Sequence, residues 1–542
     1  MKKTGRRDFL RSTTGLLAAL GAPVSPAFVR SAGARGSGRP AADLGVQVGD
    51  LRGDSALLWS RTDRDTRMRV RWSTREDFSL VLGETAVHTL EDSDYTGKVL
   101  LQGLPAGETV FYCVDFLDLA DYRTRSEPLL GHFRVAPADS SRDIRFLWSG
   151  DAVGQGWGIN PDIGGLPIFR TMASQRPDFF IHSGDVVYAD GPLQERIDLD
   201  DGRVWRNLVT PEKSKVAETL DEFRGQYRYN FVDEGLRDFF RDVPVFAQWD
   251  DHEVTNNWYW EKSRRGDGRY RESSVALLAA RAMRAFHEYM PVRHHPTDPD
   301  RIYDRFRYGP ALEVFRIDLR SYRGPNRDEQ FQTQSPASRL LGIKQLEWLK
   351  KTLALSTATW KVIASDMPLG VVVYDDSASK TGAEAIGLRD GAPAGRELEI
   401  ADLLRYLRDH EVKNVVWLTA DVHYTAAHHY SPDRAQFQDF YPFWEFVSGP
   451  LHAGTFGGNR MDNSFGPEVV FRKEAPPGKA NLSPLEGMQF FGRVDIDGES
   501  ERMTVTLMDL AGSELYTTCL EPVGRTAEYS HTGRIVRPVS IS

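Results

Sequence analysis

Six short apolar segments that end in acidic residues are the feature that most constrains the fold of this 542-residue chain. Apolar runs of this length predict strands buried on both faces, as in parallel sheets covered by helices. An acid that follows such a strand lies at the carboxyl edge of the sheet, where open α/β sheets bind their ligands. The sequence therefore predicts a crevice lined by carboxylates. The six runs end at Asp151, Asp185, Asp250–Glu253, Asp318, Asp366 and Asp421.

Carboxylates gathered in one crevice repel one another and raise one another's pKa values unless a cation neutralises them. Tyr188 and His423 closely follow two of the runs and could add a phenolate and an imidazole. These ligand types suit hard or borderline cations such as Fe³⁺, Mn²⁺, Ca²⁺ or Zn²⁺. Cations that share a carboxylate can lower the pKa of a bound water toward about 7 and hold a phosphoryl group. The cluster therefore predicts a multi-metal site, at which hydrolysis by a metal-bound hydroxide would need no protein nucleophile.

Helix signals alternate with buried strands after Pro137. This alternation predicts helices packed over mostly parallel sheets, and two such sheets suit the length of the region. We assign residues 141–525 to this α/β domain. The predicted helices lie around 168–172, 275–290, 343–353 and 400–407, and strands expected to close a sheet edge lie at 503–508 and 514–520.

Residues 43–137 have a different pattern, with short alternating strands separated by turns. Met68, Val70 and Trp72 fall on one face of a strand, and residues 110–116 alternate in the same way. No helix-length apolar periodicity intervenes, which indicates a small antiparallel β-sandwich. The stretch 103–114 resembles a fibronectin type III domain. We therefore expect a fibronectin III-like sandwich before the α/β domain.

Residues 1–34 have the pattern of an export signal. Arg6 and Arg7 are followed by Phe9-Leu10, a modest apolar stretch and small residues, as in signals of the twin-arginine route. A basic disordered tail is the alternative. No later segment reaches the length of a membrane span, so we expect no stable membrane anchor. The predicted location is the periplasm or the medium, reached through the twin-arginine export machinery.

The charge and cysteine content exclude several classes of protein. The formal net charge is −9, which argues against binding to a nucleic-acid backbone and suits a small phosphoester substrate attracted by local cations. Only Cys113 and Cys519 occur, so neither a disulfide framework nor a thiolate zinc site is expected. We expect both cysteines to act as small buried hydrophobic residues, with a single bridge between them outside the cytoplasm as the alternative.

The ordered motifs of the chain resemble those of the PhoD-type alkaline phosphatases, over about residues 43–520. The resemblance implies a four-layer metallophosphoesterase core, in which two facing mixed sheets lie between helices. It also implies hydrolysis of phosphomonoesters and phosphodiesters, twin-arginine export, and iron and calcium as cofactors. The motifs are Ser149-Gly150-Asp151, Gly184 to Asp190, Trp249 to Glu253 with Asn256-Asn257, Asp318 to Arg323, and Asp421-Val422-His423.

The resemblance also assigns roles to individual residues. Asp185 would bridge metals, Tyr188 would bind ferric iron, and His252 would be the catalytic histidine. Relatives often have a cysteine at the position of Gly150, and Asp151 would substitute for that missing thiolate. The remaining implied metal ligands are Asp251, Asp421 and His423.

Other polar residues near the strand ends have two interpretations each. Arg320 and Arg323 could bind phosphate oxygens through their guanidinium groups, or they could form salt bridges with nearby acids. We favour phosphate contact by one of them and assign Arg320 to catalysis. Asp366 could be a further ligand or could hydrogen-bond a neighbouring loop. His182 is expected to lie in the core or behind the ligands.

Two other functions remain open at this point. A phospholipase D-like phosphodiesterase would use the same site, with the aromatic run 258–260 facing a lipid or packing internally. A non-catalytic binding protein would use the sandwich for binding and hold structural calcium in the acidic crevice.

Overall fold

A computed structural model of the protein describes residues 38–139, 142–328 and 331–524. The expected export signal at 1–34 lies outside the described residues. Residues from Arg39 onward form one unit, whose fold is given below. Among the described helices, none is both long and apolar enough to cross a membrane.

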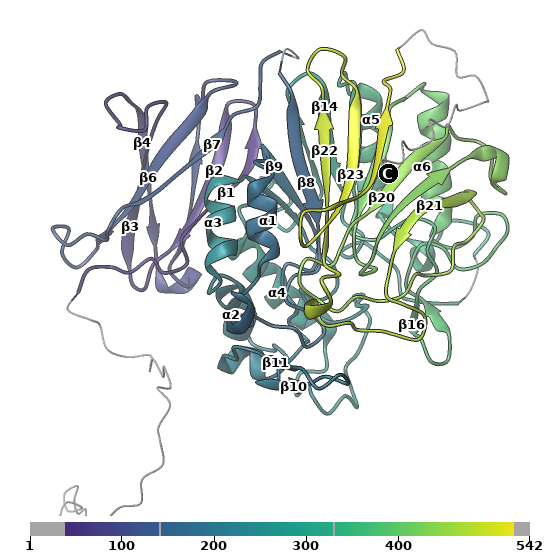
Figure 1. Ribbon diagram of the computed structural model, residues 1–542, viewed down its shortest axis with the longest axis horizontal. Coiled ribbons are helices and arrows are strands. Elements are labelled where there is room, and N and C mark those ends of the chain that lie inside the picture. The colour runs from purple at the N-terminus through teal and green to yellow at the C-terminus, as the bar shows by residue number, and fades with distance from the viewer. Residues whose placement is uncertain (1–37, 140–141, 329–330, 525–542) are drawn as a thin grey trace, which may run out of the picture. The chain divides into compact units, whose positions relative to one another are not determined.

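One of two large sheets contains nine strands (Figure 1). Its central strands are parallel, and the predicted C-terminal strands form one of its edges. In spatial order the strands are β24 (Glu514–Leu520), β23 (Met503–Asp509), β22 (Phe490–Ile496), β8 (Ile144–Ser149), β9 (Phe179–Ser183), β12 (Val245–Gln248), β1 (Val46–Arg52), β2 (Ser55–Arg61) and β5 (Thr96–Leu101).

The other large sheet contains seven strands, with a parallel centre and antiparallel edges. In spatial order they are β13 (Asp304–Tyr308), β14 (Leu312–Arg316), β15 (Trp360–Ala364), β18 (Val415–Thr419), β20 (Phe443–Val447), β19 (Thr425–Tyr430) and β21 (Pro467–Lys473). All six apolar runs predicted as buried strands are strands in these two sheets.

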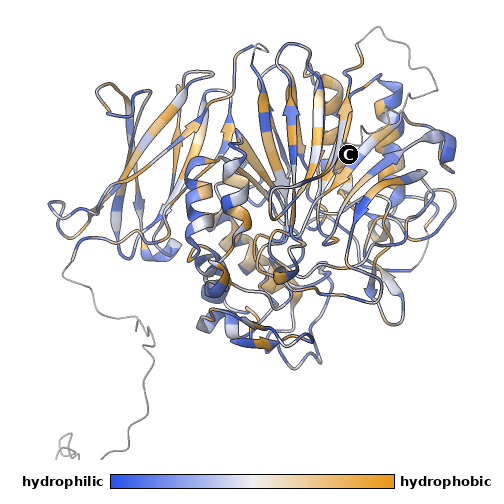
Figure 2. Cartoon of the chain, viewed as in Figure 1, coloured by the Kyte–Doolittle hydropathy of each residue, from blue (hydrophilic) through white to orange (hydrophobic). Residues whose placement is uncertain are grey.

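The two sheets pack face to face, and helices cover their outer faces. Phe146 on β8 and Val362 on β15 lie in one shared hydrophobic cluster between the sheets. Their chain neighbours Leu147 and Ile363 point the other way and pack in the clusters under the helices. The strands are therefore hydrophobic along much of their length (Figure 2). This arrangement confirms the predicted four-layer core of two mixed sheets between helices.

Six α-helices form the outer layers of the described core. Four of them match predicted helices, whereas α2 and α3 were not predicted. The buried face of α2 includes Arg224, Gln226 and Tyr227, so apolar spacing does not reveal it. The helices are α1 (Ile168–Ser174), α2 (Leu220–Asn230), α3 (Glu234–Asp242), α4 (Val275–Tyr289), α5 (Gly342–Leu355) and α6 (Glu397–Asp409).

The N-terminal region forms a β-sandwich, one sheet of which continues into the core. The strands β1, β2 and β5 face a separate four-stranded sheet, and the two share a hydrophobic cluster. Gly49 on β1 pairs with Val245 on β12, and a Cβ at Gly49 would lie 2.6 Å from the Val245 carbonyl oxygen. The sandwich therefore shares a sheet with the core. The separate sheet contains β4 (Val81–Thr89), β3 (Thr66–Ser73), β6 (Thr109–Asp118) and β7 (Leu129–Arg134).

The cysteine prediction is correct for one residue and wrong for the other. Both cysteines are free thiols, and Cys113 is buried in β6. Cys519 is exposed, because β24 is an edge strand with one uncovered side.

Two small hairpins complete the fold: β10 (Arg196–Asp198) with β11 (Val204–Arg206), and β16 (Tyr374–Asp376) with β17 (Thr381–Ala383).

Candidate metal centre

Loops at the carboxyl ends of the parallel strands bring acidic and histidine side chains from both sheets together. Potential ligand atoms form three groups, and within each group all ligand atoms lie within 4.8 Å of one another. Asp185 belongs to the first two groups and Asp251 to the last two, so carboxylates link all three. The groups are Asp151, Asp185 and His423; Asp185, Asp251 and His252; and Asp250, Asp251 and Asp421.

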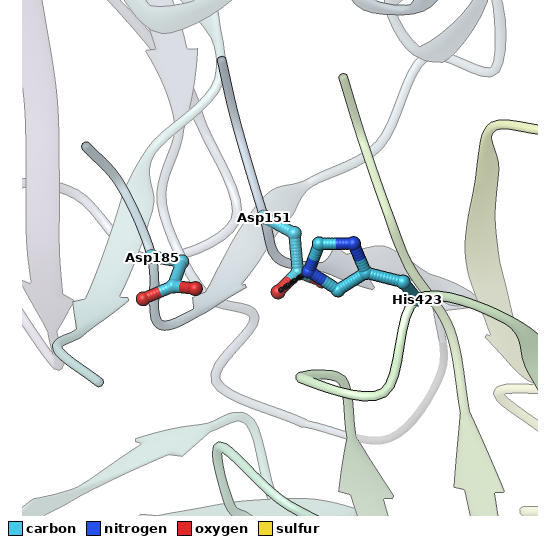
Figure 3. A group of neighbouring side chains, drawn as sticks. All are labelled: Asp151, Asp185 and His423. Atoms are coloured by element: carbon cyan, nitrogen blue, oxygen red, sulfur yellow. Dashed lines mark ion pairs between the residues drawn. The ribbon is translucent and has the colours of Figure 1, made fainter. Parts of the chain in front are cut away.

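The first group joins loops from the two facing sheets. Figure 3 shows the His423 imidazole against the Asp151 carboxylate, with Asp185 on a neighbouring loop. His423 Nε2 lies 3.4 Å from Asp151 Oδ1 and 2.9 Å from the Tyr188 hydroxyl. Its Nδ1 lies 2.6 Å from the Gly454 carbonyl oxygen, which leaves Nε2 turned toward the acids. Tyr188 therefore shares this site with the first ligand group.

Four of these ligand candidates have a left-handed backbone conformation, which is uncommon for residues other than glycine. The φ angles are 67° at Asp151, 50° at Asp185, 65° at Asp421 and 58° at His423. Such conformations cost free energy and persist where the surrounding structure imposes them. Gly449 leaves the space that the Asp151 carboxylate occupies, because a Cβ there would lie 2.3 Å from Asp151 Oδ2. The loops therefore hold these side chains in one place at the expense of backbone strain.

The electrostatics of the centre fit a cationic group. Burial, followed by the nearby charges of Asp251 and Asp250, raises the pKa of Asp185 well above its ordinary value. Burial and the neighbouring Asp250 likewise raise the pKa of Asp421. Within the described structure, Asp151 Oδ2, Asp250 Oδ2 and Asp251 Oδ1 are buried without hydrogen-bond partners. A hard cation would satisfy these oxygens and remove the repulsion.

His252 is oriented by the carboxylate of Asp190, which belongs to none of the three ligand groups. Its Nδ1 lies 2.6 Å from Asp190 Oδ1, and the other Asp190 oxygen accepts a 2.7 Å hydrogen bond from the Asn256 amide. Burial opposes a charged imidazole, but the Asp190 carboxylate outweighs it and raises the pKa of His252 to about 9. Nε2 lies 3.9 Å from Asp251 Oδ1 and so faces the ligand groups. Asp190 thus fixes which ring nitrogen faces the centre.

Replacing Asp190 with Asn should lower the stability of the chelator-treated protein in a pH-dependent way. The folded pKa of His252 is about 9 against an ordinary 6.5, and that of Asp190 is about 2 against 3.8. The contribution of the raised His252 pKa is therefore complete below pH 6.5 and disappears as pH rises through 9. The lowered Asp190 pKa reports the same ion pair from its other member, so its contribution is complete above pH 3.8 only while His252 remains protonated.

We accordingly expect the free energy of unfolding of wild type to exceed that of Asp190→Asn by about 2 to 3 kcal/mol near pH 6. Above about pH 9 the difference should be much smaller. Urea unfolding at both pH values measures this difference. An equal difference at the two pH values would contradict the proposed ion pair.

Comparison with known proteins identifies the family. The sequence model of the PhoD-like phosphatase family matches residues 146–507, and that of its N-terminal domain matches residues 28–137. The chain belongs to the PhoD-like phosphatase family. It is 25% identical to alkaline phosphatase D of Bacillus subtilis (strain 168) over 451 residues, which cover 79% of this chain and 72% of that protein. The resemblance inferred from the motifs is thereby confirmed, and the protein is a phosphoesterase.

Two solved structures show the same fold. The structure of PhoD covers 90% of each chain with a TM-score of 0.65 and 21% identity. A purple acid phosphatase isolated from seeds of yellow lupin (Lupinus luteus) matches 89% of this chain and 74% of its own, with a TM-score of 0.52 and 12% identity. The core is thus the metallophosphoesterase fold.

Gly150, at the position where the resemblance led us to expect cysteine, lies in a tight loop. A Cβ at this position would lie 3.0 Å from the Ala420 Cβ and 3.1 Å from the Gly184 carbonyl oxygen. A cysteine here would require these neighbours to shift. The next residue, Asp151, has its carboxylate in the first ligand group.

Arg320 is fully buried among acidic residues. Its Nε donates to Asp250 Oδ1 and its Nη1 to Glu384 Oε1. Nη2 is the guanidinium nitrogen without a hydrogen bond to any described residue, and it lies 3.8 Å from Asp421 Oδ1. A phosphate contact by Arg320 would have to be made through Nη2. Arg323 is also buried and donates a 3.0 Å hydrogen bond to Glu384 Oε1, as in the salt-bridge interpretation.

Asp366 and His182 are buried and belong to none of the three ligand groups. Asp366 is buried and accepts a 2.7 Å hydrogen bond from the Met367 amide, and none of the three ligand groups includes it. His182 is buried against Phe180, and burial lowers its pKa to about 3. The imidazole of His182 is therefore neutral, as suits a core position.

Asp250 and Glu253 are candidate site residues to which the sequence analysis gave no individual role. Asp250 contributes an oxygen to the third ligand group. Glu253 accepts hydrogen bonds from the amides of Val186, at 2.5 Å, and Asp250, at 2.7 Å. It therefore ties the loop after β9 to the loop after β12. The acidic run 250–253 was visible in the sequence. The sequence did not show which of its acids are ligand candidates and which one joins two loops through hydrogen bonds.

Proposed function

We propose that this phosphoesterase is an exported, metal-dependent hydrolase of phosphomonoesters and phosphodiesters. The observation that supports the proposal is the set of three ligand groups linked by Asp185 and Asp251. Adjacent groups that share a carboxylate suit a multinuclear centre, which can bind several oxygens of one phosphoryl group.

The ligand set favours hard or borderline cations. Asp151, Asp185, His423 and Tyr188 would bind one cation, for which Fe³⁺ is our first candidate. Burial, then the charge of Asp185, raises the pKa of Tyr188 well above its ordinary value, so only a strongly polarising cation would make it a phenolate. The carboxylates of the third group suit Ca²⁺, and Mn²⁺ or Zn²⁺ would also fit. Bound cations would lower the pKa of a coordinated water and polarise the phosphoryl oxygens.

The protein's own contribution to the reaction would come from His252. The Asp190 carboxylate keeps Nδ1 engaged and favours the protonated imidazole. Nε2 faces the ligand groups, so its proton can pass to the leaving oxygen or stabilise charge on the phosphoryl group. His252 is thus proposed as general acid.

An ester-hydrolysis assay tests this function. Purified protein should release nitrophenol from p-nitrophenyl phosphate and from bis(p-nitrophenyl) phosphate. A chelator should abolish both activities, and added metal should restore them. Elemental analysis of protein purified with its native metals would identify the cations. Binding of calcium without turnover of either ester would contradict the proposed function.

Hydrolysis of phosphatidylcholine tests the phospholipase D-like alternative on the same site. The aromatic run 258–260 is partly internal: Trp258 is buried, whereas Trp260 is more exposed and donates a 2.6 Å hydrogen bond to the Ser321 carbonyl oxygen. This packing favours soluble esters over a lipid surface. Faster release of choline than of nitrophenol would reverse that preference.

Export through the twin-arginine route is proposed from the sequence of residues 1–34. Arg6 and Arg7 carry the proposal. Wild type should show hydrolase activity in the periplasmic or culture fraction. A variant with lysine in place of both arginines should keep its activity in the cytoplasm, which would support this route.

A further inference from the structure

Glu384 is a buried acid that lies outside every motif discussed above. It follows β17 of the small hairpin, whose partner strand β16 is labelled in Figure 1. Its side chain is 2% exposed and binds Arg320 Nη1, with Arg323 Nη1 at 3.0 Å and Asn326 Nδ2 at 2.7 Å. The side chain of Glu384 therefore meets two buried guanidinium groups.

Arg320 connects Glu384 to the third ligand group. While Nη1 binds Glu384, Nε donates to Asp250 and Nη2 lies 3.8 Å from Asp421. Asp250 and Asp421 are two of the three members of that group. A single guanidinium thus lies between a ligand group on one side and Glu384 on the other.

A guanidinium and a metal cation compete for the same carboxylates. If Arg320 moved closer to Asp421 and bound it through Nη2, the oxygens of the third group would have less negative charge to offer a cation. Glu384 opposes this movement because it binds Arg320 from the opposite side. Asp250 Oδ2 and Asp251 Oδ1, which lack hydrogen bonds to other described residues, then remain free for a cation.

The other arginines around Glu384 do not depend on its carboxylate to the same degree. Arg396 donates to the carbonyl oxygens of Ala383, at 2.9 Å, and Gly324, at 3.1 Å. Arg323 also donates to the backbone carbonyl of Glu384. The hydrogen bonds of the Arg320 guanidinium, in contrast, go to Glu384 and Asp250.

We infer that Glu384 is a positioning residue that sets the cation affinity of the Asp250, Asp251 and Asp421 group by holding Arg320. The inference rests on the proposed metal centre. It predicts that Glu384 changes the cation affinity of one class of site. The cation affinity of the Asp151, Asp185 and His423 group should stay unchanged, because Arg320 hydrogen-bonds no member of that group.

A calorimetric titration of chelator-treated full-length protein with Mn²⁺ tests this effect. Glu384→Gln should weaken one class of sites by about tenfold or more, the range typical of residues behind metal ligands. The remaining sites should bind Mn²⁺ as in wild type. Turnover should fall at limiting Mn²⁺ and recover at high Mn²⁺, which loss of folded protein would not produce.

Glu399→Gln is the matched control. Glu399 is equally buried, but its carboxylate accepts hydrogen bonds from the amides of residues 340–342 at the start of α5. This variant should lose stability without a change in Mn²⁺ affinity. Equal Mn²⁺ affinities of Glu384→Gln and Glu399→Gln would overturn the inference.

Two further variants keep the test decisive if Glu384→Gln does not fold. Asn326→Ala removes a hydrogen bond to Glu384 without removing its charge, and should weaken the same class of sites to a smaller degree. In an Arg320→Met background, Asn326→Ala should have no further effect on Mn²⁺ affinity, because its influence passes through Arg320. An undiminished effect in that background would overturn the inference. Wild type that binds no Mn²⁺ would overturn the proposed function as well.

Discussion

Replacing Asp185 with Asn should remove bound metal and hydrolytic activity together. Asp185 contributes to two of the three ligand groups, and its Oδ1 also accepts a 3.0 Å hydrogen bond from the His252 amide. The substitution keeps the shape of the side chain but removes one negative charge and one ligand oxygen. Loss of residues that only support metal ligands typically costs about 10- to 100-fold, so loss of this shared ligand should cost more than about 100-fold in activity.

Elemental analysis and turnover of bis(p-nitrophenyl) phosphate, measured on the same preparation, check this expectation. Asp318→Asn is the matched control, because Asp318 is also a buried strand-end acid. It accepts hydrogen bonds from the amides of Arg320 and Ser321, both at 2.9 Å, and belongs to none of the described ligand groups. The control should retain its metals. Normal metal content in Asp185→Asn would contradict the bridging role.

Replacing His252 with Asn should lower turnover while leaving the metal content nearly intact. A general acid typically contributes about 100- to 10,000-fold to the rate, so a fall in kcat of this size is expected. The backbone amide of residue 252, which binds Asp185, is present in any variant. Metals held mainly by the carboxylates should therefore remain bound.

The choice of leaving group separates the general-acid role from simple damage to the site. Nitrophenolate leaves readily without a proton, whereas an alkoxide needs one. The fall in kcat should consequently be larger for an alkyl phosphate than for p-nitrophenyl phosphate. His252 also belongs to the second ligand group, and loss of metal from His252→Asn would show that it is a ligand instead.

The sequence alone was sufficient to predict the central strands and the edge where the centre lies. Buried parallel strands need continuous apolar runs, and each run from Phe146 to Leu418 carries its acid at the carboxyl end. Asp151, Asp185, Asp251, Asp421 and His423 were predicted as neighbours on this basis, together with the motif order. The local pattern is informative here because strand direction and side-chain alternation are properties of a few consecutive residues.

Helices and sheets assembled through polar or distant contacts were less predictable. The polar buried face of α2 hides its period, and the pairing of Gly49 with Val245 joins segments about two hundred residues apart. The sequence pattern therefore indicated a sandwich at 43–137 but not its continuity with the core sheet.

The partners of the ligands were determined by the tertiary structure. Asp190 is paired with His252 across 62 residues, and Arg320 is held between Asp250 and Glu384, which are 70 and 64 residues away from it. Nothing in a local pattern distinguishes an arginine that contacts substrate from one that balances buried acids, because both follow a strand end. The strand-end acids could thus be predicted from sequence, whereas the charges that orient and balance them depend on loops brought together by the two facing sheets.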